Sequence, residues 1–141
     1  MTDLQRFVDA QDADGTWERA LRELSAGRKQ SHWMWFVLPQ VAGLGRSETA
    51  QRYALADLDE ARAYLAHPVL GPRLREAAAV LDVLPTDDAV EVLGSTDAQK
   101  LRSCMTLFAR ADPDEPLFRG VLAKYYAGEP DPATLERLGA V

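Results

Sequence analysis

Residues that start and stop helices recur at short intervals along the whole chain, and this recurrence limits the fold more than any other feature of the sequence. Ser47 precedes residues with helical spacing, and Asp57 with Glu60 forms the pattern of a capping box, in which side chains bond free backbone N–H groups. Gly27 and Gly94 follow apolar stripes, where glycine commonly closes a helix. The pattern predicts an all-α protein with about eight or nine short helices.

The connections between the predicted helices are short turns rich in glycine, proline and aspartate. So many helices with such short connections favour an irregular multihelical array over a simple bundle. A chain of 141 residues that is 47% hydrophobic can form one core and is too apolar for a disordered chain. Neither a linker nor an exact internal repeat divides the sequence, so we predict a single helical domain over residues 1–141.

The apolar segment from Trp33 to Leu38 is ambiguous, because periodicity cannot separate a buried helix from a buried strand when nearly every residue is apolar. We favour a short helix that is capped by Ser31 and ended by Pro39. Residues 41–45 contain two glycines and are typical of a loop.

Other helix starts are expected from single residues. Thr2 is a suitable cap for the first helix, and Thr86 for a short helix that Gly94 ends. Ser95 or Thr96 is a suitable cap for the longer helix that follows.

The charge balance and the cysteine count indicate where a chain like this works. With 16 basic and 22 acidic residues, its net charge of −6 argues against nucleic acids and anionic membranes as partners. The single cysteine, Cys104, allows no intrachain disulfide, which favours a reducing compartment. The first 14 residues lack the pattern of a signal peptide, and the longest apolar stretch, residues 33–39, is far short of the roughly 20 residues that a membrane span needs. We therefore expect a soluble cytoplasmic monomer.

Cations and aromatic side chains gather in two parts of this acidic chain. Arg28 and Lys29 precede His32 and Trp35, and permanent cations beside aromatic faces suit an anionic, planar ligand. A second polar group lies on a later helix, and Tyr53 with Arg46 can line the loop between the two groups. We predict a site for a nucleotide-like or phosphorylated small molecule, formed by Arg28, Lys29, His32, Trp35, Gln40, Lys100 and Arg102.

Two other interpretations of these residues stay open. In the first, the aromatic segment is only core, and Arg28 with Lys29 only marks a helix end. In the second, the protein is an interaction module without catalytic activity, and Trp33, Trp35 or the pair Tyr125 and Tyr126 anchors a protein partner.

The sequence specifies no reaction, so it leaves open whether the protein is an enzyme. Two distant histidines and one cysteine form no metal-binding spacing, and we expect no metal and no cofactor. The glycines at 43 and 45 lack the remaining residues of a phosphate-binding loop. Cys104 has apolar neighbours, which is typical of an inert buried thiol.

Several stretches together resemble a bacterial family called domain of unknown function 1810. The similar stretches are residues 3–8, 10–11, 27–29, 31–36, 39–40, 43–45, 60–65, 67–68, 70–74, 100–103 and 105–109. The resemblance implies a small multihelical fold and no established activity. Some members are labelled calpastatin, an inhibitor built from disordered repeats, and that label does not suit a chain this apolar.

Overall fold

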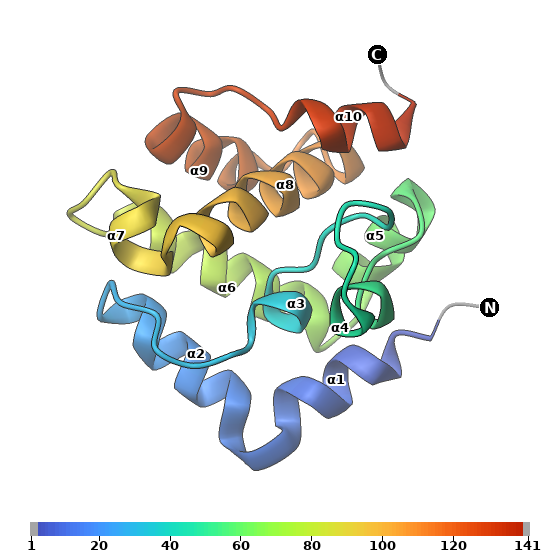
Figure 1. Cartoon of the computed structure of the whole chain (residues 1–141), viewed down its shortest axis with the longest axis horizontal. Coiled ribbons are helices and arrows are strands. Elements are labelled where there is room, and N and C mark those ends of the chain that lie inside the picture. Colours follow the sequence, from blue (N-terminus) through green and yellow to red (C-terminus); the bar gives the residue numbers. More distant parts are fainter. Residues whose placement is uncertain (1–2, 140–141) are drawn as a thin grey trace.

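The computed structural model describes residues 3–139 and confirms the predicted all-α fold (Figure 1). Within these residues lie ten α-helices and one turn of 3-10 helix, η1: α1 (Gln5–Asp12), η1 (Ala13–Gly15), α2 (Thr16–Ser25), α3 (Met34–Val37), α4 (Glu48–Arg52), α5 (Leu58–Ala66), α6 (Leu70–Val83), α7 (Ala89–Leu93), α8 (Ser95–Ala111), α9 (Pro116–Tyr126) and α10 (Pro132–Leu138). The count is slightly above the predicted eight or nine, with three helices of only four or five residues.

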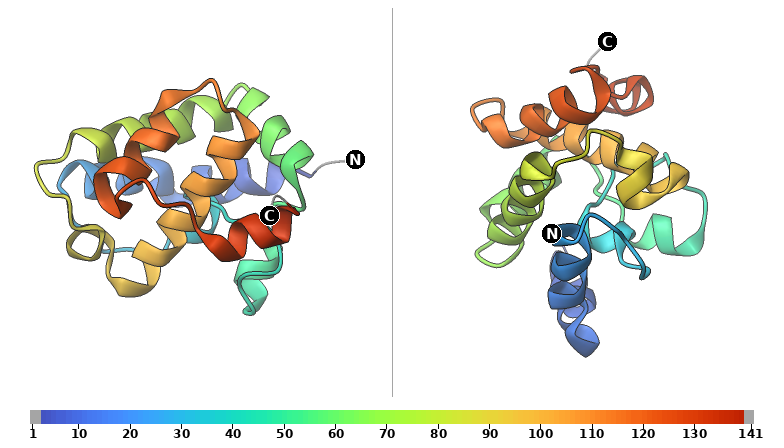
Figure 2. Two further views of the ribbon diagram at one scale, coloured as in Figure 1. Left: turned by 90° about the horizontal axis from the view of Figure 1, so that it is seen from above. Right: turned by 90° about the vertical axis from the view of Figure 1, so that its left-hand side faces the viewer.

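The long helix α8 holds the array together, because it packs against α5, α7, α9 and α10. Helix α6 lies beside α5 and α9 and also contacts α2. The N-terminal helices α1 and α2 form a V at the far side of the molecule from α9 and α10 (Figures 1 and 2). The bend of the V falls at Asp14 and Gly15, both of which have positive φ angles.

A chain of aromatic rings runs through the centre of the core. Phe7 of α1 meets Tyr64 of α5 edge to face, with 5.2 Å between the ring centroids. Tyr64 in turn lies 5.4 Å from Phe108 of α8, and Phe108 lies 5.8 Å from Phe118 of α9. Such edge and tilted contacts add to the stability that burial gives. The core therefore links the N-terminal V to the C-terminal helices.

The ambiguous apolar segment forms a helix, as we favoured, but only one turn of it, α3. The predicted cap was wrong: the N-cap is Trp33, and Ser31 instead donates its hydroxyl hydrogen to the carboxylate of Glu23 on α2. Within residues 3–139, strand-like pairing is limited to one isolated bridge between Val41 and Leu55.

Two of the other expected helix caps are confirmed. Ser47 and Asp57 accept backbone hydrogen bonds at the starts of α4 and α5, as predicted.

The expected caps of α7 and α8 were wrong. The cap of α7 is Asp88 in place of Thr86, because the Asp88 carboxylate accepts from the N–H groups of the first turn. Helix α8 follows Gly94 directly, so neither Ser95 nor Thr96 is its cap. Thr2 lies outside the described residues.

None of the helices in the described part of the chain has both the length and the apolar character required to cross a lipid bilayer.

Candidate functional site

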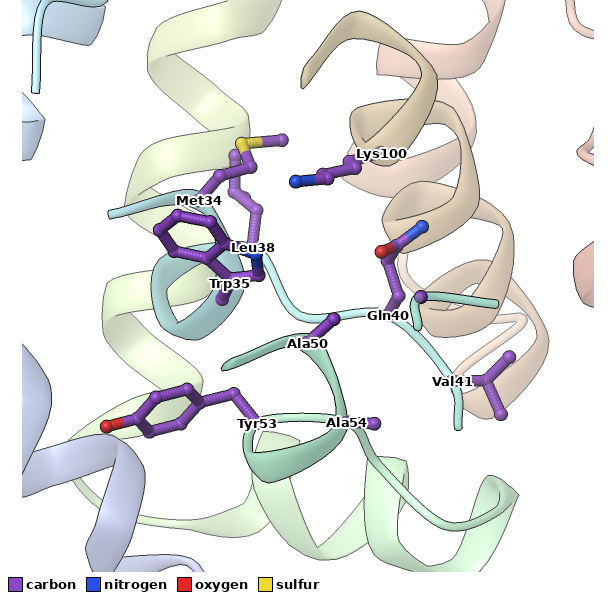
Figure 3. Close-up of a pocket in the computed structure, with 10 residues that line it drawn as sticks. Met34, Trp35, Leu38, Gln40, Val41, Ala50, Tyr53, Ala54 and Lys100 are labelled. Carbon is purple, nitrogen blue, oxygen red and sulfur yellow. The ribbon is translucent and has the colours of Figure 1, made fainter. Parts of the chain in front are cut away.

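A narrow cleft lies where α3, the following loop, α4 and the start of α8 meet (Figure 3). Trp35 comes from α3, Gln40 from the loop, Tyr53 from the end of α4, and Lys100 from α8. The free space between the lining side chains is about 10 Å³, which is about enough for one water molecule. The full lining consists of Met34, Trp35, Leu38, Gln40, Val41, Gly45, Ala50, Tyr53, Ala54 and Lys100.

The loop over residues 38–47 is held against the cleft by contacts at three places. Its backbone pairs with Leu55, which accepts from the N–H of Ala42 at 2.7 Å and donates to the carbonyl of Gln40 at 2.9 Å. Nε of Arg137 on α10 donates to the carbonyl of Ala42 at 3.2 Å. A side chain at Gly45 would overlap the Cβ of Ala50 on α4, so only glycine fits this wall.

Three charged groups meet at one edge of the cleft. The Asp97 carboxylate lies 2.9 Å from Nζ of Lys29 and 3.6 Å from Nζ of Lys100. Nζ of Lys100 also lies 4.9 Å from the centre of the Trp35 ring, within the range of a cation–π contact. Two lysines and one aspartate leave a net charge of +1. The Lys29 side chain is 9% exposed and that of Lys100 is 22% exposed, so Lys100 is the more accessible cation.

The segment before α3 is fixed by Glu23 of α2. Its carboxylate accepts hydrogen bonds from the N–H groups of Gln30 and Ser31, from the Ser31 hydroxyl and from the Trp33 indole N–H. Burial alone would raise the pKa of Glu23, but these hydrogen bonds outweigh it and lower the pKa to about 2. We call Glu23 together with residues 30–33 the Glu23 cluster. Because it fixes the backbone directly before α3, it sets where α3 starts and where Trp35 points.

The predicted site residues fall into separate places. Trp35, Gln40 and Lys100 line the cleft together, and Lys29 joins them through Asp97. The side chains of Arg28 and His32 are exposed and are not part of the lining. Nε of Arg102 donates to the carbonyl of Glu129 at 3.1 Å, and Nη2 donates to that of Pro130 at 3.0 Å.

Helix geometry explains why Arg102 is apart from the cleft. Residues two positions apart on an α-helix are separated by roughly 200° around its axis, so Lys100 and Arg102 cannot face the same side. Lys100 faces α3, whereas Arg102 faces the connection between α9 and α10. Asp97, which sequence reasoning missed, lies one turn before Lys100, and that spacing was the available signal for their contact.

Comparison with known proteins places this arrangement in a family. The family model described as protein of unknown function DUF1810 matches residues 1–138. This chain belongs to the DUF1810 family. The conserved hypothetical protein Rv1873 from Mycobacterium tuberculosis, known from a crystal structure, is 46% identical to this DUF1810 chain. The match covers 99% of this chain and 98% of that one, with a TM-score of 0.94. The comparison with curated proteins found no match.

Most of the aromatic residues that we considered as anchors for a protein partner are instead buried or hydrogen-bonded within the DUF1810 fold. Trp33 is 0% exposed. The hydroxyl of Tyr125 donates to the carbonyl of Leu81 at 2.6 Å, and that of Tyr126 donates to the carbonyl of Ala98 at 2.5 Å. Trp35 remains partly accessible at the cleft.

The side chains of this DUF1810 chain differ in the chemistry that they could supply. Cys104 is fully buried, and burial raises the pKa of its thiol well above the ordinary value, as expected for an inert cysteine. Over residues 3–139, groups of three or more histidine, cysteine or acidic side chains suited to a metal ion are absent. The cleft instead offers an ammonium group, an indole face and the amide of Gln40.

Proposed function

We propose that this protein binds a small anionic molecule with a planar ring, such as a nucleotide or another phosphorylated metabolite, in the cleft between α3 and α8. The observation that carries the proposal is the position of the Lys100 ammonium group, 4.9 Å from the Trp35 ring. Together they offer a cation for a phosphate or carboxylate and a flat surface for a ring. Lys29 is a second cation near the cleft, since it pairs with the same Asp97 carboxylate that contacts Lys100.

Binding requires the cleft to widen, because its present free space is about 10 Å³. The loop over residues 38–47 is the part best suited to move, since it lies between helices α3 and α4 and is held by two backbone hydrogen bonds to Leu55 and one side-chain hydrogen bond from Arg137. A ring entering between the loop and α3 would stack on Trp35, and its charged group would replace part of the contact between Lys100 and Asp97. Gln40 lies on the loop side, where its amide can both donate to and accept from the ring.

Arg28, His32 and Arg102 belong to the ligand set predicted from the sequence, but this proposal does not depend on them. The proposal covers binding and assigns no reaction. The expectations of a monomer, of a cytoplasmic location and of no nucleic-acid partner belong to the same proposal. The net charge of −6 supports the last of them.

Thermal-shift measurement against nucleotides and sugar phosphates tests the proposal. A ligand at about 100 times its dissociation constant stabilises the folded protein by about 2.7 kcal/mol. We expect at least one such compound to raise the melting temperature and to quench the fluorescence of Trp35. Lys100→Met should remove this shift.

The matched control is Arg28→Met, which removes one exposed cation of the same segment without touching the cleft. It should leave the shift in place. A shift lost in Arg28→Met but kept in Lys100→Met would move the site away from the cleft, and no shift with any compound would reject the proposed function.

A further inference from the structure

A second, larger pocket lies on a different side of α8 from the Lys100 cleft. Helices α8 and α9 run side by side, and the connection from α9 to α10 returns to α8 (Figures 1 and 2). The pocket between them has a volume of about 330 Å³, which is within the range of small-molecule sites. It shares no lining residue with the cleft.

The lining of this pocket is divided by charge. Arg110 near the end of α8 and Arg119 near the start of α9 are at the same end of the helix pair, where the chain turns from one helix to the next. Arg119 is fixed at this end because Nη1 donates to the carbonyl of Pro113 in the turn. The floor between the helices is apolar and includes Ala109 and Leu122.

The two arginines also lack carboxylate partners among the described residues, although the chain has an excess of acidic groups. The other cation on this side of α8, Arg102, is already paired with Glu129 at 3.8 Å. Guanidinium groups match the geometry of a carboxylate, to which they donate two parallel hydrogen bonds. The end of the pocket at the turn is therefore suited to a carboxylate.

From this arrangement we propose that the pocket between α8 and α9 binds a small organic acid with an apolar body, such as a medium-chain fatty acid or an arylalkanoic acid. The carboxylate lies between Arg110 and Arg119, and the hydrocarbon part lies over Ala109 and Leu122. This inference does not depend on the function proposed for the cleft, since the two sites use different residues.

Titration with octanoate tests the inference, with 1-octanol as a neutral ligand of the same length. Octanoate should shift the backbone amide resonances of Ala109, Leu122 and Gly128 in a two-dimensional NMR spectrum, and octanol should bind more weakly. The double variant Arg110→Gln, Arg119→Gln should weaken octanoate binding by about tenfold or more, because it removes both cations that donate charge-assisted hydrogen bonds to the carboxylate.

Two further variants keep the test decisive. The double variant Arg22→Gln, Arg46→Gln makes the same change of net charge at exposed positions outside the pocket and should bind octanoate as the native protein does. Ala109→Leu fills the apolar floor without changing any charge and should also weaken octanoate binding. Absence of binding to the native protein, or equal binding by the two double variants, would overturn the inference.

Discussion

The Glu23 cluster and the Lys100 cleft share one short segment of the chain, and each uses one of its two tryptophans in a different way. Trp33 is wholly buried, and its indole N–H donates to the Glu23 carboxylate at 2.9 Å. Trp35, two residues later, keeps part of its ring accessible under Lys100. The difference shows that, of two tryptophans only two positions apart, one can stabilise the core while the other leaves part of its ring accessible.

The same division occurs on α8, where Lys100 faces the cleft and Arg102 bonds the connection between α9 and α10. On α8 the two residues are separated by two positions, a spacing that does not put side chains on one face of a helix, whereas Trp33 precedes α3 and has a non-helical backbone. The cluster is thus a structural region, whereas the cleft is the region for which we propose a ligand, and this contrast can be tested by mutation.

The largest expected effect comes from removing the buried tryptophan. Trp33→Ala should lower the free energy of unfolding by about 3–5 kcal/mol, because it leaves a cavity in the core and takes one donor from Glu23. Trp35→Ala should cost much less, since its ring is already partly in solvent. Urea denaturation of both variants measures the difference. Equal losses would mean that the two tryptophans do not have separate roles.

The second effect is a dependence of stability on acid through Glu23. Its pKa is about 2 in the folded protein and about 4.5 in the unfolded chain, so the unfolded state binds more protons between these values. The stabilisation by the carboxylate is therefore complete above about pH 4.5 and is lost as the pH falls toward 2. We expect it to amount to about 1–2 kcal/mol, after allowance for screening by solvent.

Glu23→Gln isolates this contribution, because the amide does not titrate. The difference in the free energy of unfolding between the native protein and this variant should be constant at pH 5–7 and should shrink toward pH 3. The control is the same measurement of unfolding free energy against pH for Glu18→Gln, which changes an exposed glutamate on the same helix. A difference that stays constant down to pH 3 would show that the hydrogen bonds do not lower the Glu23 pKa.

Sequence reasoning predicted the helices well, but it could not predict which of the candidate side chains lie together, because helix signals are local and these contacts are not. Caps such as Asp57 act through residues within one turn, so their signal is local. Ser31 was assigned to a cap incorrectly, because its partner, Glu23, lies in a preceding helix and only tertiary packing brings them together. Lys29 and Asp97 form an ion pair across 68 positions, for which a single sequence contains no signal.

A third prediction concerns Arg102, the cation that sequence reasoning placed beside the ligand. Arg102→Ala removes hydrogen bonds to the carbonyls of Glu129 and Pro130 and should lower the free energy of unfolding by about 1 kcal/mol. It should leave a ligand-induced thermal shift at the cleft unchanged, in contrast to Lys100→Met. Loss of the shift in Arg102→Ala would show that both faces of α8 take part in the site.

The smallest effect is expected for Asp97, whose carboxylate contacts both the largely buried Lys29 and the more accessible Lys100. Asp97→Asn removes the carboxylate between Lys29 and Lys100. The charge at the cleft then rises from +1 to +2. One further unit charge about 4 Å from an anion is worth about 1 kcal/mol in water, so an anionic ligand should bind about fivefold more tightly. Calorimetric titration at two salt concentrations measures this gain, which should decrease at the higher ionic strength. Weaker binding by Asp97→Asn would mean that the carboxylate orients Lys100 and that this orientation outweighs its charge.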